Sequence, residues 1–197
     1  MNSFQSIIFA GLLLGLSSPT LAEPRDFEID EEHFSIMFRV HHVGFADQIG
    51  LFLKASGSFV YDEESNELHS GEVEVDASSV FTNHERRDGH VRNRDFLHAR
   101  RHGTIRFEAD GWHPNEDDPR TGRLTGDLTL LGETRPVELT ATINKMDYFP
   151  FGHEKYTMGV SASTTILRSE WGMTYGVEEG MVGDEVHLAF EFEALAQ

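Results

Sequence analysis

Cysteine is absent from the sequence, and no long apolar run follows residue 22. Without cysteine, the fold has no disulfide bonds, no thiolate metal site, no catalytic thiol and no lipid-modified N-terminal cysteine. A helix that crosses a bilayer needs about 20 consecutive apolar residues, and the chain after residue 22 contains no such segment. We therefore expect the mature protein to be free in solution.

Lysine and arginine are also scarce. They number 16 against 34 Asp and Glu, which gives a formal net charge of −18, and residues 1–22 contain no ionisable side chain. The whole negative charge therefore falls on residues 23–197, where it repels nucleic acid and anionic lipid headgroups. We expect no nucleic-acid partner, and we interpret the charge as a contribution to solubility.

The apolar run near the N-terminus is short. It extends over residues 7–16 and is followed by Ser17-Ser18-Pro19 and Thr20-Leu21-Ala22. This order is typical of a secretory signal peptide, although no Lys or Arg precedes the run, and a buried N-terminal helix is the alternative. We predict that residues 1–22 are a cleaved signal peptide. Residues 23–197 are then one domain in the periplasm of a Gram-negative-type cell.

Apolar and polar residues alternate along most of the mature chain, which is the pattern of half-buried β-strands. About eight such runs occur, separated by turn-like stretches at residues 62–66, 113–119 and 132–134. Their apolar sides contain Phe34, Ile36, Phe38 and Val40; Val73 and Val75; Ile105, Phe107 and Ala109; Leu124, Leu128 and Leu130; Val137, Leu139, Ala141 and Ile143; Met158, Val160, Ala162, Thr164 and Ile166; and Val186, Leu188, Phe190 and Phe192.

Two architectures bury one face of each of eight strands: a sandwich and a closed barrel. Short turns between consecutive strands favour an up-and-down barrel. The parity of the apolar residues changes between Phe52 and Phe59, and Gly57 lies in this interval, which predicts a β-bulge or a sharp bend. We predict an all-β fold, a single eight-stranded antiparallel β-barrel with one or two short helices.

Residues 84–103 do not alternate and are expected to form a loop with short helical turns. This stretch carries six of the 16 basic residues and four of the 11 histidines. One hypothesis is a polar cap at a barrel mouth, where Arg and His hold an oxygen-rich headgroup. The simpler alternative is internal pairing, because Glu85, Asp88 and Asp95 are close in sequence.

Neither metal binding nor catalysis is predicted. His98 and His102 have the spacing of one helix face, but no HExxH pattern accompanies them. His41 and His42 point to opposite faces of a strand and cannot chelate together. A G-x-S-x-G nucleophile motif is absent, and Ser79, Thr82 and His84 beside a strand end are better explained as turn caps.

Four groups of short motifs occur in order along residues 27–193. They are Phe27-Glu28-Ile29-Asp30 with His42-Val43-Gly44 and Gly57-Ser58-Phe59; Ser79-Val80-Phe81-Thr82 with Arg87-Asp88-Gly89-His90 and Asp95-Phe96-Leu97; Gly126-Asp127-Leu128-Thr129-Leu130 with Thr134-Arg135-Pro136-Val137; and Arg168-Ser169 with Gly172-Met173 and Val182-Gly183-Asp184-Glu185-Val186. In this order they resemble the YceI-like family of bacterial lipid-binding barrels. Phe34 and Val91 depart from the family's usual residues.

The resemblance implies a lipocalin-like barrel with an internal apolar tunnel that takes a polyisoprenoid or quinone-like lipid. It implies no required cofactor and no established activity. It also implies a monomer or homodimer that has an amphiphilic lipid as its partner and can contact a membrane transiently. The tunnel-wall residues carried over are Phe38, Phe52, Phe59, Phe107, Leu128, Val160 and Phe190. The headgroup or gating residues carried over to the mouth are His42, Arg87, Asp88, His90 and Asp95.

Two other functions remain open at this point. An enzyme acting on a bound lipid requires His42, Asp88 or His90 to converge on one reactive atom. An interaction protein of stress responses requires a barrel filled by its own side chains. Phenylalanine, used 15 times, suits either a filled core or a lined tunnel, so composition does not decide between them.

Overall fold

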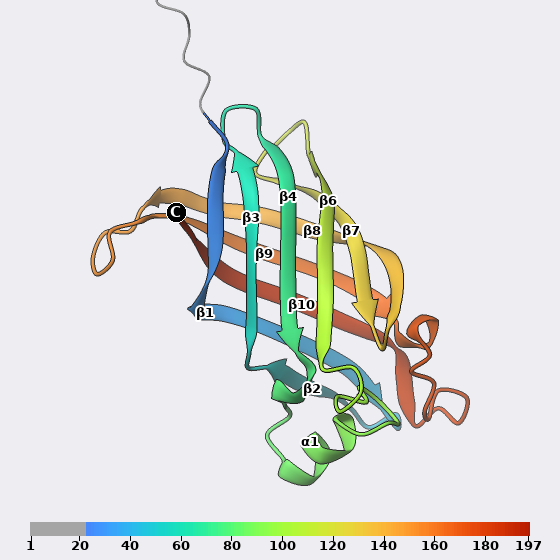
Figure 1. The fold of residues 1–197 in the computed structure, drawn as a ribbon. Coiled ribbons are helices and arrows are strands. Elements are labelled where there is room, and N and C mark those ends of the chain that lie inside the picture. Colours follow the sequence, from blue (N-terminus) through green and yellow to red (C-terminus); the bar gives the residue numbers. More distant parts are fainter. Residues whose placement is uncertain (1–22) are drawn as a thin grey trace, which may run out of the picture.

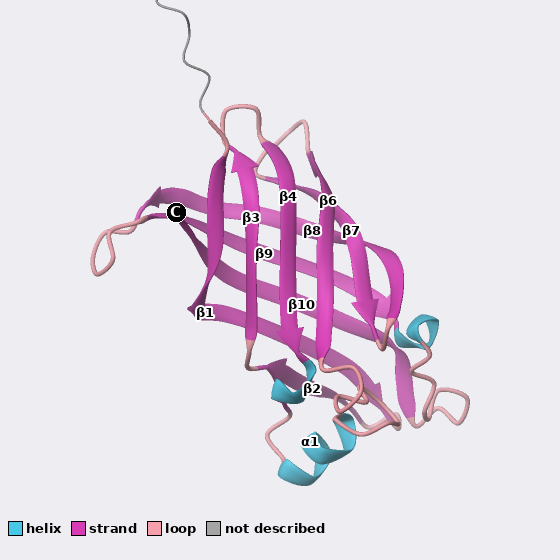
Figure 2. Cartoon of the chain, in the orientation of Figure 1, coloured by secondary structure: helices cyan, strands magenta, loops and turns pink. Residues whose placement is uncertain are grey.

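The computed structural model of the chain describes residues 23–197, and the predicted signal peptide, residues 1–22, lies outside them. Ten strands and one α-helix follow one another along the chain (Figures 1 and 2). The strands are β1 (Arg25–His42), β2 (Ala46–Phe52), β3 (Ala55–Asp62), β4 (Glu67–Asp76), β5 (Val80–Phe81), β6 (Thr104–Pro114), β7 (Thr121–Leu130), β8 (Glu133–Tyr148), β9 (Tyr156–Leu167) and β10 (Val182–Ala196). The α-helix is α1 (Glu85–Val91), and two short 3-10 helices are η1 (Ala77–Ser79) and η2 (Arg168–Trp171).

The strands form one closed antiparallel sheet. Hydrogen-bonded neighbours follow the order β10-β9-β8-β7-β6-β4-β3-β1-β2-β5, and β1 also pairs with β10, which closes the sheet. The strand β2 pairs with one half of β1 and β3 with the other half, while β5 continues β4 beside β2. The ten segments therefore make an eight-stranded barrel of lipocalin type, which confirms the predicted fold class.

The barrel wall is interrupted where the parity of the apolar residues changes. Between β2 and β3, the backbone nitrogens of Leu53 and Lys54 both donate to Oγ of Ser79 instead of to a neighbouring strand. The predicted bend is confirmed, and it lies a few residues before Gly57. A Cβ on Gly57 would overlap the carbonyl oxygen of Glu72, so this glycine allows β3 and β4 to approach closely.

The strand β1 also contains a large bulge. Ile29 is paired with Ala194 and Phe34 with Phe192, so the four residues from Asp30 to His33 lie opposite the single residue Glu193. Bulges bend a strand and increase its twist. Figure 1 shows β1 changing direction along its length, so that its two halves run along different parts of the barrel.

The helix α1 and the loops around it lie at one end of the barrel, the end at which β1 finishes (Figure 1). The predicted irregular stretch, residues 84–103, contains α1 followed by turns. No helix among residues 23–197 has both the length and the apolar character needed to cross a bilayer.

Candidate functional site

A cavity of about 840 Å³ occupies the interior of the barrel. The inward side chains of all eight strands contribute to its lining, which is dominated by aliphatic and aromatic groups. A volume in this range is typical of small-molecule pockets. All seven predicted wall residues line the cavity: Phe38, Phe52, Phe59, Phe107, Leu128, Val160 and Phe190. Their contact with a ligand remains a prediction.

Phe38 and Phe52 face each other across the β1–β2 pair, with ring centroids 5.7 Å apart. Gly50 is the strand partner of Phe38, and a Cβ on this glycine would overlap the far end of the Phe38 ring. The phenyl ring therefore lies over the backbone of Gly50 because this position has no side chain.

Most of the polar lining residues gather at that same end. They come from the end of β1, the start of β2, the region around β5, and α1, and they include His42, Gln48, Thr82, His84, Arg86, Arg87 and His90. The structure thus brings three of the five predicted headgroup residues, His42, Arg87 and His90, to one end of the cavity. His41, the neighbour of His42, points outward and pairs with Asp47 at 3.1 Å.

Asp88 and Asp95 do not line the cavity. Asp88 is buried, and its Oδ1 accepts hydrogen bonds of 2.6 Å from both the backbone nitrogen and the hydroxyl of Thr82. Burial alone would raise the pKa of Asp88, but the two hydrogen bonds from Thr82, with the charges of Arg92 and Arg87, hold it below the usual value. The carboxylate therefore fastens α1 to the strand end beside it.

Arg87 extends the same contact, because its Nε donates to Oγ1 of Thr82 at 2.8 Å. Arg92 donates to the backbone oxygens of Ser78 and Val80. Asp95 lies outside the cavity with its Oδ2 3.4 Å from Nε2 of His90. Some side chains of the basic stretch therefore hold the loop, and Arg86, Arg87 and His90 line the cavity. Their contact with a headgroup stays a prediction.

Arg168 is a cavity-lining residue to which the sequence analysis assigned no role. Its guanidinium is buried and donates to four backbone oxygens, those of Met173, Tyr175, Val182 and Gly183, at 2.7 to 2.9 Å. These contacts fold the segment between η2 and β10 against the cavity. The only signal in the sequence was its place in the Arg168-Ser169 motif, which gave no indication of burial.

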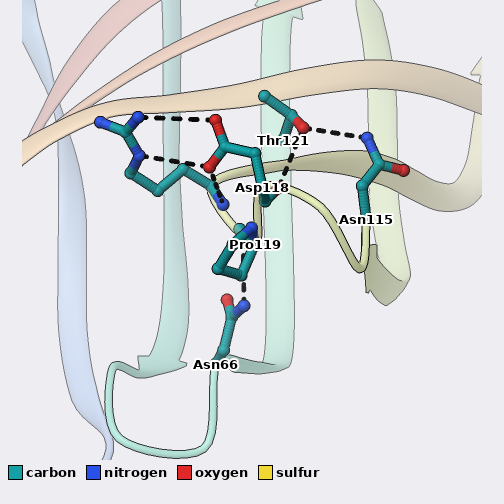
Figure 3. Close-up of polar contacts among 6 residues, drawn as sticks. Asn66, Asn115, Asp118, Pro119 and Thr121 are labelled. Carbon is teal, nitrogen blue, oxygen red and sulfur yellow. Dashed lines mark hydrogen bonds and ion pairs between the residues drawn. The ribbon is translucent and has the colours of Figure 1, made fainter.

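The opposite end of the cavity is closed by aromatic side chains. Tyr61 and Trp112 both line the cavity and both donate to Oδ1 of Asn66, at 2.5 and 2.9 Å. Burial, reinforced by the charge of Glu63, raises the pKa of Tyr61 to about 12, so its hydroxyl remains a donor. Figure 3 shows how Asn66 also donates to the backbone oxygen of Pro119, which ties the turn after β3 to the loop after β6.

The loop after β6 is itself held by short-range hydrogen bonds. Nδ2 of Asn115 donates to Oγ1 of Thr121, and this hydroxyl donates to the backbone oxygen of Asp118 (Figure 3). These hydrogen bonds hold the loop that accepts the hydrogen bond from Asn66.

An apolar rim borders the α1 end of the cavity. Phe45, at the tip of the turn between β1 and β2, is 91% exposed. Val43 of the same turn is also exposed, and its backbone nitrogen donates to the backbone oxygen of Met181 at 3.0 Å. Val43 and Met181 both line the cavity as well, so the apolar surface continues from the interior to the outside.

A closed antiparallel barrel with one large apolar cavity and a polar end defines a binding-protein fold of lipocalin type. The YceI-like domain family matches residues 27–194, and the chain belongs to this family. A UPF0312 protein of Pseudomonas paraeruginosa is 33% identical over 192 residues, which cover 95% of this chain and 97% of the relative.

Two solved structures share the fold. A Campylobacter jejuni YceI protein superposes with a TM-score of 0.70 at 25% identity, over 80% of this chain and 90% of that chain. A polyisoprenoid binding domain from Saccharophagus degradans, implicated in plant cell wall breakdown, has a TM-score of 0.66 at 12% identity, over 87% of this chain and 98% of that chain.

Proposed function

We propose that this protein is a periplasmic carrier that holds a long-chain isoprenoid lipid, of polyprenyl or quinone type, inside the barrel. The observation that carries the proposal is the cavity itself, which is apolar along the barrel and polar at the α1 end. Such a gradient matches an amphiphile that has a long apolar tail and a compact polar head. The polyisoprenoid-binding neighbour from Saccharophagus degradans supports the choice of ligand class.

Hydrophobic burial supplies the affinity. Each buried methylene group contributes about 0.8 kcal/mol, so a tail of roughly 15 carbons gains on the order of 12 kcal/mol before costs. Ordering the tail and losing its free translation take back several kcal/mol. The remainder corresponds to micromolar to nanomolar binding without any specific polar contact. The apolar part of the cavity then selects lipids by the length and width of the tail, and the polar end selects them by the headgroup.

In this proposal the headgroup contacts His42, Arg87 and His90, which line the cavity at its polar end. Guanidinium and imidazole groups donate hydrogen bonds to carbonyl, hydroxyl or phosphate oxygens. Asp88 and Asp95 act indirectly in this proposal, because their carboxylates hold Thr82 and His90. Binding rather than catalysis is proposed, since Asp88 is engaged by Thr82 and does not converge with His42 and His90 on one point of the cavity.

Loading from a membrane is assigned to the apolar rim of Val43, Phe45 and Met181. All three side chains are exposed, and Val43 and Met181 also line the cavity, so a lipid tail can pass from a bilayer to the barrel along apolar surface. The export needed to reach that membrane is assigned to the signal peptide, residues 1–22. Cleavage after Ala22 would release residues 23–197 as a monomer or homodimer in the periplasm.

The first experiment is native mass spectrometry on protein purified without detergent, compared with an organic extract of the same sample. A bound mass that extracts as an isoprenoid or quinone supports the carrier function. A ligand-free mass, with no uptake when prenols and quinones are offered, overturns it in favour of an interaction protein. Val160→Trp should abolish loading by filling the cavity, whereas the outward Ser163→Trp on the same strand should not.

A further inference from the structure

The bulge in β1 brings together three side chains that can bind a metal ion. Nδ1 of His33 lies 2.7 Å from Oδ2 of Asp30 and 3.9 Å from Oε2 of Glu193. The potential ligand atoms of these residues all lie within 4.8 Å of one another. Asp30 and His33 come from the four bulged residues of β1, and Glu193 is the single residue of β10 opposite them.

The oxygen of Glu193 provides an independent indication of a missing partner. Oε2 of Glu193 is buried, and it has no hydrogen-bond partner among residues 23–197. A buried carboxylate oxygen without a partner is costly, and native structures seldom leave one unsatisfied. This oxygen belongs to the same cluster as the imidazole of His33, so a cation there would satisfy it.

The bulge also fixes the orientation of Asp30. Its Oδ1 accepts a hydrogen bond of 2.9 Å from the backbone nitrogen of Glu32, which is an Asx turn, and this leaves Oδ2 directed at His33. Bulges of this kind often redirect side chains at functional positions. The backbone therefore orients Asp30, and Asp30 in turn holds His33, before any ion arrives.

We propose that Asp30, His33 and Glu193 bind one divalent transition-metal ion, with zinc as the best match. One imidazole nitrogen and two carboxylate oxygens suit zinc, whereas calcium and magnesium prefer oxygen ligands alone. Zinc–ligand distances of about 2.1 Å place tetrahedral ligands roughly 3.4 Å apart. The 2.7 Å contact must open by about 0.7 Å and the 3.9 Å contact must close by about 0.5 Å, changes that side-chain rotation can supply.

The site is separate from the lipid cavity, because none of its three residues lines that cavity. The site lies where β1 pairs with β10 to close the barrel. A bound ion would therefore link these two strands at the bulge, where their regular pairing is interrupted. The strong negative charge of the domain concentrates cations around it.

The test is a calorimetric titration of the untagged, chelator-treated chain with zinc chloride. We expect one zinc ion per chain, and a weakening of at least about tenfold in His33→Gln and in Glu193→Gln, because metal sites lose 10- to 100-fold even when a supporting residue is removed. The matched control is His41→Gln, which removes another His–Asp pair, between His41 of β1 and Asp47 of β2.

Thermal unfolding gives a second measurement. Zinc should raise the unfolding midpoint of the wild-type chain and of His41→Gln, since an ion bound only by the folded state stabilises it. It should not raise the midpoint of the other two variants. Stoichiometric binding that survives both His33→Gln and Glu193→Gln, or no binding by the wild type, overturns the proposal. Neither result bears on lipid loading, which mass spectrometry measures separately.

Discussion

The indole nitrogen of Trp112 donates a 2.9 Å hydrogen bond to the amide oxygen of Asn66, which links β6 to the turn before β4. The hydroxyl of Tyr61 donates to the same oxygen. Both aromatic residues line the cavity, so one turn side chain closes its far end. We therefore predict that Asn66 controls the length of the lipid tail that the barrel accepts.

Asn66→Ala should open this end of the cavity. It leaves the buried donors of Tyr61 and Trp112 without a partner, which costs about 1–3 kcal/mol of unfolding free energy. We also expect the preferred tail to become longer, because Trp112 is free to turn away. Urea unfolding and competition among prenols of increasing length measure the two effects. Asn115→Ala, in the exposed loop beside it, is the control and should leave tail preference unchanged. An unaltered length profile in Asn66→Ala would contradict this role.

Gly50→Ala should narrow the cavity from the β2 side. The added methyl group would overlap the end of the Phe38 ring, and the ring can escape only by tilting away from β2. Because the ring is the end of a flexible side chain, we expect a loss of stability of only about 1–3 kcal/mol from overpacking. We expect the main effect of the substitution to be a lower affinity for prenols and not a loss of unfolding free energy.

A fluorescence competition assay with a prenol measures that affinity. The control is Gly89→Ala in α1, where an added Cβ meets no atom within 4 Å. Alanine is the better helix former, so this variant should be as stable as the wild type or slightly more stable. Equal affinities in wild type and Gly50→Ala would show that the Phe38 ring does not limit the ligand.

The barrel could be predicted from the sequence because the alternation of apolar and polar residues is a local, periodic pattern within each strand. Phe107 and Leu128 were placed on inward faces by alternation alone, and they are direct partners in the β6–β7 pair. The bulge at Asp30 was not predicted, since the pairing that it interrupts joins β1 to β10 at the far end of the chain. Alternation shows which way a side chain points only while the register is regular.

Roles at the cavity's polar end were harder to predict. Asp88 and His90 belong to one motif, yet their side chains have different surroundings. Asp88 is buried against Thr82 and does not line the cavity, whereas His90 lines it. Sequence gives their spacing but not the rotation of the short helix that carries them. Arg168 was unassigned for a similar reason, because its partners are four backbone oxygens, two from the loop after η2 and two from the start of β10. Backbone groups are present in every residue, so the sequence does not reveal such a site.

Phe45→Ser should slow the loading of lipid from vesicles without weakening the bound state. The ring is exposed at the tip of the β1–β2 turn and does not line the cavity, so its removal changes only the approach to a bilayer. We expect a slower transfer rate from prenol-loaded vesicles and an unchanged equilibrium affinity. Phe151→Ser is the control, since Phe151 is also exposed but belongs to the loop between β8 and β9. An equal slowing in both variants would indicate nonspecific adsorption.

Asp88→Asn tests whether a charged anchor holds α1 in place. The folded pKa of Asp88 is below that of an unfolded aspartate, which is about 3.9. Its ionised form therefore stabilises the fold fully above pH 4, and this contribution is lost as the pH falls through the lower folded value. At pH 7 we expect Asp88→Asn to lose about 2 kcal/mol, the scale of hydrogen bonds to a charged acceptor. As the pH falls through the folded pKa, the wild-type carboxyl becomes protonated, so the difference between the two proteins should shrink. Urea unfolding over a series of decreasing pH values measures it, with Asp95→Asn, a partly exposed carboxyl, as the control. A difference that stays constant with pH would mean that the shape of Asp88, rather than its charge, holds the helix.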